Sequence, residues 1–356
     1  MEIIELEVTL DSLISELVKT VEMNQTINSE NLSVSSKEAA SHATLAYILD
    51  KAAELGFIIK NVTKGVGYIQ YGEGAESDDY IGIFGNVGTN AKTVNHVTNS
   101  LPTFTDNMSA MITNLFSLYA LKQLKITFDV PVRIIFTIDK DGEFEHIKDY
   151  LRLEVVPLFG WTPTSTWCVT YPTYQQAKIR IQSKHSKEST NHQDTGSIRE
   201  ILDLTMRNHK SLETDVPIYG INITKIYEAK DHMNVEISYP ETIKSNDLKV
   251  FIETNMLENQ VYTFHSMPQH VVESMHSHYI EPLTQSYAQV TGERIEPRKA
   301  DMLTYASLIQ NTVGFGPRLI RRSEYMDTKD TRELLRRNME IYTRSLLMLS
   351  GIVEST

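Results

Sequence analysis

The sequence predicts an α/β protein whose main domain is interrupted by a smaller α+β unit. In residues 1–173, apolar strands alternate with helix-length segments, a pattern typical of a sheet covered by helices on both faces. In residues 174–268, shorter elements follow in the order strand, helix, strand, strand, helix, strand, which is a ferredoxin-like βαββαβ unit. Residues 269–356 return to the first pattern, so we expect them to complete a discontinuous main domain.

The elements of the main domain follow from the spacing of apolar residues and from turn residues. Two helices are expected before the first strand, at residues 10–21 and 36–55, and the second stops at Gly56, a common helix terminator. The other expected elements are strands at 57–62, 67–71, 80–84, 130–138 and near 314–315, and helices at 107–124, 271–290 and 327–349. Long helices between strands favour a mostly parallel sheet, whose functional sites lie at the carboxyl ends of strands. Asn86 and Asp139 each follow such a strand end.

The inserted unit shows alternating strands and two amphipathic helices. The expected strands are 175–182, 218–228, 232–239 and 260–266, and the expected helices are 197–208 and 246–256.

Composition excludes several classes of partner. The formal charge of −12, from 34 Lys and Arg against 46 Asp and Glu, argues against nucleic acid and anionic membranes, which bind clustered cations. A single cysteine, Cys168, excludes an intrachain disulfide framework and a thiolate zinc site, and we interpret it as a packing residue. An acidic N-terminus and the lack of an apolar run of about 18 residues favour a cytoplasmic protein without a membrane span.

Several strings, taken in order, resemble one known family. They are Tyr71-Gly-Glu-Gly74, Tyr80-Ile-Gly-Ile-Phe-Gly85, Ile134-Ile-Phe-Thr-Ile-Asp139, Gly160-Trp-Thr-Pro163, Ile218-Tyr-Gly-Ile-Asn-Ile-Thr-Lys-Ile-Tyr227, Asn234-Val-Glu-Ile-Ser-Tyr-Pro240 and Thr312-Val-Gly-Phe-Gly-Pro317. The ordered set resembles the co-catalytic zinc dipeptidase and carboxypeptidase family, which includes PepV-like dipeptidases, carnosinase and enzymes of the carboxypeptidase G type.

This resemblance implies a phosphorylase/hydrolase-like zinc-peptidase catalytic domain with the inserted α+β unit as its lid. Members of the family use two zinc ions, which clamp the scissile carbonyl and lower the pKa of a bridging water. Histidine and carboxylate side chains hold the ions, and a glutamate acts as general base. Members bind a peptide or amino acid in the cleft between the two domains, and the resemblance is compatible with a homodimer or with pairing to an active paralogue.

The family's zinc ligands have largely been replaced in this sequence. The resemblance places the five ligand positions at Asn86, Asp106, Asp141, Thr164 and Ile320. Only Asp106 and Asp141 are carboxylates, and neither family histidine is present. Lys140 stands at the general-base position, where its positive charge repels zinc and its ordinary pKa prevents it from accepting a proton at neutral pH. We therefore expect no dizinc centre, no resident cofactor and no catalytic residue.

The retained carboxylates also have structural interpretations. Asp106 precedes a predicted helix, where aspartate is a favoured N-cap, and Asp139 and Asp141 lie in an acidic turn of a kind common for backbone reasons. The first hypothesis is a non-catalytic protein that binds a peptide or amino acid or has a regulatory role. The alternative is an active metal-dependent dipeptidase or other hydrolase with a remodelled site, in which Asp106, Asp141 and His96 hold one metal ion. A third hypothesis is a structural subunit that pairs with an active paralogue.

Overall fold

The chain forms two compact units in the computed structural model. The first, here called the main unit, consists of Met1–Pro172, Val271–Ala300 and Thr304–Thr356. The second, the inserted unit, consists of Thr173–His270 and Asp301–Leu303. The structure describes residues 3–29, 34–72, 79–88, 107–139, 144–164, 166–171, 174–183, 222–229, 232–240, 243–255, 260–266, 278–299, 304–309, 311–317 and 328–353.

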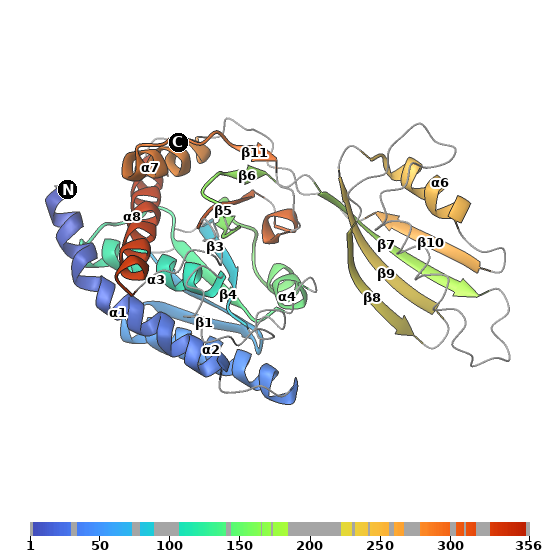
Figure 1. Ribbon diagram of the computed structural model, residues 1–356, viewed down its shortest axis with the longest axis horizontal. Helices are drawn as coiled ribbons and strands as arrows, with labels where there is room; N and C mark the ends of the chain where they lie inside the picture. The colour runs from blue at the N-terminus through green and yellow to red at the C-terminus, as the bar shows by residue number, and fades with distance from the viewer. Residues whose placement is uncertain are drawn as a thin grey trace. The chain divides into compact units, whose positions relative to one another are not determined.

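Long helices and short strands make up the main unit (Figure 1). The helices are α1 (Ile3–Ser29), α2 (Val34–Glu54), α3 (Asn107–Gln123), α4 (Glu145–Leu153), α7 (Ile280–Thr291) and α8 (Thr328–Val353), with a 3-10 turn η1 (Tyr305–Ser307). The strands are β1 (Ile58–Thr63), β2 (Val66–Tyr71), β3 (Ile81–Asn86), β4 (Val132–Thr137), β5 (Phe159–Thr162), β6 (Thr170–Tyr171), β11 (Arg298–Lys299) and β12 (Thr312–Gly314).

The sheet of the main unit is mixed, with the strand order β1-β2-β4-β3-β5-β12-β6-β11. Its central strands β4, β3, β5 and β12 run parallel, as do β6 and β11, whereas β1–β2, β2–β4 and β12–β6 are antiparallel. The expectation of a mostly parallel sheet therefore holds for the central strands and for the edge pair β6–β11, but not for β1–β2, β2–β4 and β12–β6. β1 and β2 are antiparallel because the two-residue turn at 64–65 that joins them is too short to connect parallel strands.

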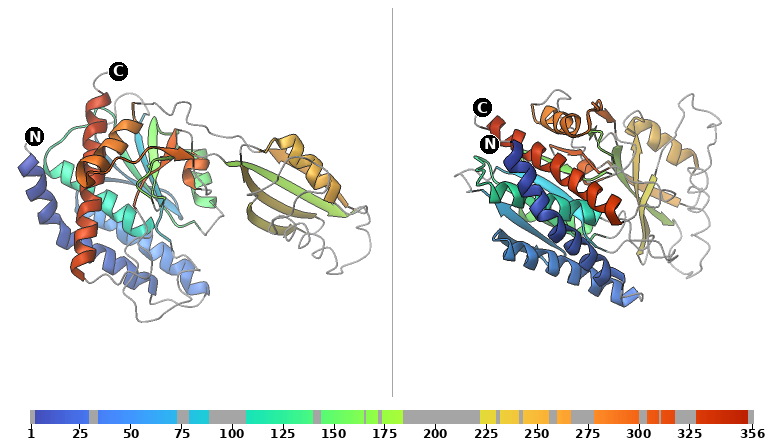
Figure 2. Two further views of the ribbon diagram at one scale, coloured as in Figure 1. Left: turned by 45° about the horizontal axis from the view of Figure 1, so that its top comes forward. Right: turned by 60° about the vertical axis from the view of Figure 1, so that its left-hand side comes forward.

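Two apolar cores lie on opposite faces of this sheet. Successive side chains of a strand point to opposite faces, so Ile134 packs into the core beneath α1, α2, α3, α7 and α8, while Ile135 packs with Tyr150 of α4 and Tyr305 of η1. Figures 1 and 2 show α1, α3 and α8 grouped on one side of the sheet and α4 on the other. The central strands are therefore packed between helices on both faces of the sheet.

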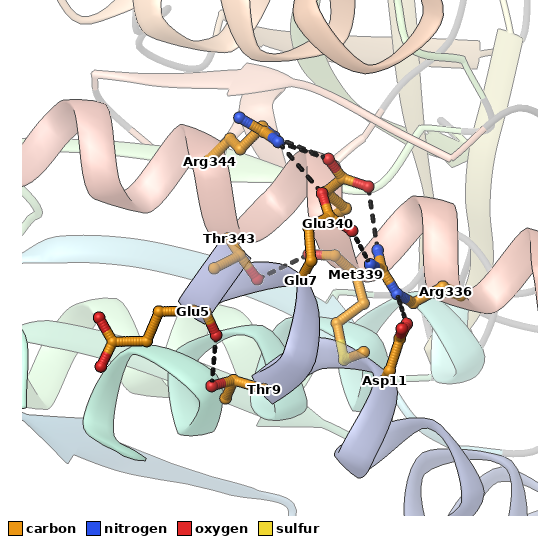
Figure 3. Close-up of polar contacts among 9 residues, drawn as sticks. All are labelled: Glu5, Glu7, Thr9, Asp11, Arg336, Met339, Glu340, Thr343 and Arg344. Carbon is orange, nitrogen blue, oxygen red and sulfur yellow. Dashed lines mark hydrogen bonds and ion pairs between the residues drawn. The ribbon is translucent and has the colours of Figure 1, made fainter. Parts of the chain in front are cut away.

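An ion-pair network joins the first and last helices of the main unit (Figure 3). The Arg336 guanidinium of α8 contacts the carboxylates of Glu7 and Asp11 on α1, the latter at 2.7 Å, and that of Glu340 on its own helix at 2.9 Å. Arg344 also contacts Glu7, at 3.5 Å, and Glu340, at 2.7 Å. Arg336 is only 16% exposed, so water screens its pairs less than it screens a surface pair.

Four differences from the expected elements concern the main unit. The helix expected at 10–21 is longer and spans Ile3–Ser29. The sequence analysis did not predict α4, although Ile147 and Tyr150 lie three residues apart on its buried face. It also missed the short strands β5, β6 and β11. Within the described residues the helix expected at 271–290 begins at Ile280, after a turn at 278–279, and its first part, residues 271–277, lies outside them.

The inserted unit contains a four-stranded antiparallel sheet and a helix. Its elements are β7 (Tyr174–Ser183), β8 (Asn222–Ala229), β9 (His232–Pro240), α6 (Ser245–Asn255) and β10 (Gln260–Ser266). The strand order β10-β7-β9-β8 is that of a ferredoxin-like unit. The helix expected at 197–208 lies outside the described residues. Within the part of the chain that the structure describes, no helix of either unit is both long and apolar enough to cross a membrane.

Candidate functional site

Asn86 lies at the carboxyl end of β3, beside the carboxyl end of β4. The two strands are parallel, and Asn86 pairs in register with Thr137. The Asn86 amide nitrogen donates to the carbonyl oxygen of Asp139 at 2.7 Å, and its amide oxygen accepts from the backbone N–H of Gly88 at 2.9 Å. The side chain thus links the backbone after β3 to the backbone after β4, and both of its polar groups are engaged in that link.

The Asp139 carboxylate is buried and bonded on both oxygens. It is 3% exposed. One oxygen accepts from the backbone N–H of His146 at 2.7 Å, and the other accepts from the N–H of Ile147 at 3.3 Å and from the Tyr305 hydroxyl at 2.8 Å. The first two donors belong to the first turn of α4, where a negative charge stabilises the helix N-terminus. Asp139 therefore has the backbone role that its place in an acidic turn suggested.

Tyr305 brings a distant part of the chain to this network. Its hydroxyl oxygen lies 2.6 Å from the Thr137 hydroxyl oxygen, and its ring packs edge-on against Phe144 with centroids 5.4 Å apart. Because the one Tyr305 hydroxyl proton goes to Asp139, we infer that Thr137 donates to Tyr305. The sequence analysis gave Tyr305 no role, because no periodic pattern of residues connects it with the strand ends.

Thr164 lies two residues beyond β5, near the end of β12. Its backbone N–H donates to the carbonyl oxygen of Gly316 at 2.8 Å, while its hydroxyl is buried without a hydrogen-bond partner. Gly314 leaves no room for a larger residue, since an added Cβ would lie 2.1 Å from the Thr170 hydroxyl oxygen and 2.5 Å from the Thr164 methyl carbon. A neutral hydroxyl thus occupies a position where the resemblance implies an aspartate.

The remaining predicted site residues fall outside the described residues. They are His96, Asp106, Lys140, Asp141 and Ile320. The structure therefore brings together Asn86, Asp139 and Tyr305, and it describes Thr164 separately at the end of β5.

The described residues do not fit a dizinc centre. Zinc in proteins is held by imidazole, thiolate or carboxylate groups, and the two ligand positions that the structure describes carry an amide and a hydroxyl. The Asn86 oxygen is already engaged by Gly88, and the Asp139 carboxylate is committed to α4 and Tyr305. Within the described ranges no three His, Cys, Asp or Glu side chains gather in a way that could hold a metal ion.

No protein-family model and no curated protein matches the chain. Several solved structures do match it. Human carnosine dipeptidase 1 matches with a TM-score of 0.55 at 10% identity, over 98% of this chain and 99% of that one. The dipeptidase Dug1p from Saccharomyces cerevisiae matches with a TM-score of 0.56 at 10% identity, over 96% and 98%. An M20 family metallo-carboxypeptidase from Sulfolobus solfataricus matches with a TM-score of 0.53 at 11% identity, over 92% and 99%.

The chain has the fold of the M20 metallopeptidases. This finding confirms the predicted fold class, an α/β zinc-peptidase-type domain with an inserted α+β unit, and it confirms the resemblance at the level of the backbone. A shared M20 fold carries no chemistry by itself, because function depends on the side chains at the site. In this M20-fold chain the end of β3 carries Asn86, whose amide closes a turn.

Proposed function

We propose that this chain is a non-catalytic homologue of the M20 dipeptidases, with a degenerate dizinc site, which binds a peptide or amino acid or has a regulatory role. One observation carries the proposal: Asn86 stands at a strand end where the resemblance implies a zinc-binding histidine, and its amide ties the backbone at Gly88 to the backbone at Asp139. A side chain that stabilises the loop in this way is not free to bind an ion.

The neighbouring positions support the same conclusion. Thr164 offers a neutral hydroxyl where an aspartate is implied, and Lys140 replaces the glutamate that would activate water. The Asp139 carboxylate has three donors, which satisfy its charge without a metal. The backbone at the strand ends is thus held by hydrogen bonds among the protein's own groups.

Metal content is the decisive test of the proposal. The purified protein is incubated separately with zinc, manganese and cobalt, desalted and subjected to elemental analysis, beside an Asp106→Ala variant treated in the same way. We expect less than about 0.1 ion per chain in both proteins. Near-stoichiometric metal that disappears in the variant would contradict the proposal, and it would favour the alternative of an active hydrolase whose metal is held by Asp106, Asp141 and His96.

Ligand binding tests the positive half of the proposal. The Met111 side chain lies against Gly85 at the end of β3, so its ε-methyl group is a local reporter for the strand-end region. We expect dipeptides or amino acids to shift the Met111 methyl resonance saturably without being hydrolysed. If no member of a dipeptide panel shifts it, the chain binds no such ligand near β3, and a structural role becomes the better hypothesis.

We also propose a reducing, cytoplasmic setting and assembly either as a homodimer or with an active paralogue. The free thiol of Cys168 is buried, and its sulfur lies 3.1 Å from the carbonyl oxygen of Glu296, as suits a packing residue that stays reduced. Light scattering on the purified protein distinguishes a dimer from a monomer, and affinity purification from the source cell identifies a paralogue if one pairs with it.

A further inference from the structure

A groove between α1 and α2, away from the strand ends, has the features of a second binding site. It has a volume of about 550 Å³ and is lined by side chains of these two helices alone. This volume lies in the range of about 300–1,000 Å³ that small-molecule sites occupy. The lining residues of each helix are three and four positions apart, which places them on one face.

One set of charges in the groove is paired internally. Lys51 of α2 contacts Glu16 of α1 at 2.5 Å and Glu54 of its own helix at 3.1 Å. The Lys51 side chain is 16% exposed, so this triad forms a fixed wall of the groove. These three side chains bridge the two helices and together keep a net charge of −1, from one lysine and two glutamates.

A second set of polar groups in the same groove has no protein partner. Lys19 of α1 and Asp50 of α2 are both exposed, and within the described part of the chain neither makes a hydrogen bond or an ion pair. The half-buried Tyr47 ring packs against the main core, while its hydroxyl likewise has no partner in that part. Met23 is 42% exposed in the groove, although methionine is usually buried. Outside the triad, the groove therefore presents one cation, one anion, one hydroxyl and an apolar surface.

We propose that this groove binds a small zwitterion, namely a free α-amino acid with an apolar side chain. The ligand carboxylate pairs with the Lys19 ammonium, the ligand ammonium pairs with the Asp50 carboxylate, and the apolar side chain lies against Met23 and Tyr47. A ligand with only one charge leaves one of the two protein charges unpaired. The inference is independent of the proposed function, because it uses no residue of the strand ends.

The test uses methyl NMR with L-leucine as the probe. The protein is labelled at the methionine ε-methyl groups, and the Met23 resonance is assigned with a Met23→Leu variant. We expect L-leucine to shift the Met23 resonance saturably. Isovalerate and isoamylamine, which each carry one of its charges, should bind up to about fivefold more weakly, since an exposed ion pair contributes up to about that factor. Absence of a Met23 shift with L-leucine would overturn the inference.

Charge reversal provides the matched control. Lys19→Glu and Asp50→Lys each leave two like charges in the groove and should abolish the L-leucine shift, whereas the double variant restores one cation and one anion and should recover it. If the single variants bind L-leucine as the native protein does, the two charges are not the binding groups and the inference fails. The Met111 resonance separates the two sites: a shift there without one at Met23 supports the proposed function and contradicts the groove site.

Discussion

At the scale of single residues, Asn86 links two segments of backbone that lie far apart in the sequence. Its amide can form hydrogen bonds to both Asp139 and Gly88 because it carries both a donor and an acceptor. The sequence alone predicted that Asn86 lies at a strand end. It did not predict this link, because the partner Asp139 is brought close only when β4 pairs with β3.

Replacing Asn86 should therefore weaken the fold. We expect Asn86→Ala to lower the free energy of unfolding by about 1–2 kcal/mol, because it removes two hydrogen bonds. Asn86→Asp should lower it at least as much, since its carboxylate would face the Asp139 carbonyl oxygen. Urea unfolding followed by tryptophan fluorescence measures the main unit, which contains both tryptophans, Trp161 and Trp167. The exposed Asn61 provides an Asn→Ala control, and equal effects at the two sites would contradict the assigned link.

The hydrogen bonds of Tyr305 should stabilise the same region cooperatively. Thr137, Asp139 and Tyr305 are at most 5% exposed, so a lost partner is not replaced by bulk water. We expect Tyr305→Phe to lower the free energy of unfolding by about 1–2 kcal/mol, and Thr137→Val to have a smaller effect when combined with Tyr305→Phe than in the native protein. A double-mutant cycle measured by urea unfolding tests this coupling, and strictly additive effects would show that the two hydroxyls act separately.

At the scale of elements, the sequence predicted best the segments whose periodicity is long. α1, α2, α3 and α8 were all anticipated because several turns of apolar spacing identify a helix. α4 was missed because its nine residues follow directly on an acidic turn and show little more than two turns of pattern. Its first turn depends on Asp139, and Asp139 depends on Tyr305, which is 166 residues away. Such a contact leaves no periodic trace in the sequence.

The ion-pair network should hold α1 against α8. Arg336 joins Glu7 and Asp11 of α1 to Glu340 of α8, so Arg336→Ala leaves three acidic side chains without that partner. We expect the free energy of unfolding to fall by about 1–3 kcal/mol at low salt, more than for an isolated surface pair. The loss should shrink in 0.5 M sodium chloride, because salt screens the remaining repulsion.

Arg337 is the matched control for this prediction. It is the next residue of α8 and is exposed, and no ion pair involving it occurs within the described residues. Arg337→Ala should change the urea midpoint little at either salt concentration. If the two variants behave alike, the network seen in Figure 3 does not stabilise the contact between the helices.

At the scale of the whole molecule, the two cores of the main unit make its stability sensitive to alkali. Burial raises the pKa of Tyr150 to about 12 and also raises the pKa values of Tyr80 and Tyr342. Tyr80 and Tyr150 lie in the core on the α4 side, with their hydroxyl oxygens 3.1 Å apart, while Tyr342 lies in the core on the other face. Neutral phenols thus belong to the folded state on both sides of the sheet.

The sign of the pH dependence follows from these shifts. Above pH 10, the ordinary pKa of tyrosine, the unfolded chain releases phenol protons that the folded chain keeps, so stability is complete below pH 10 and falls as the pH rises toward 12. Each such tyrosine contributes a slope of about −1.4 kcal/mol per pH unit. Tyr150→Phe removes one of these groups, so between pH 10.5 and 11.5 its unfolding free energy should fall less steeply than that of the native protein by about this amount. Urea unfolding at several pH values measures both slopes, and parallel lines would mean that Tyr150 titrates equally in the folded and unfolded chains.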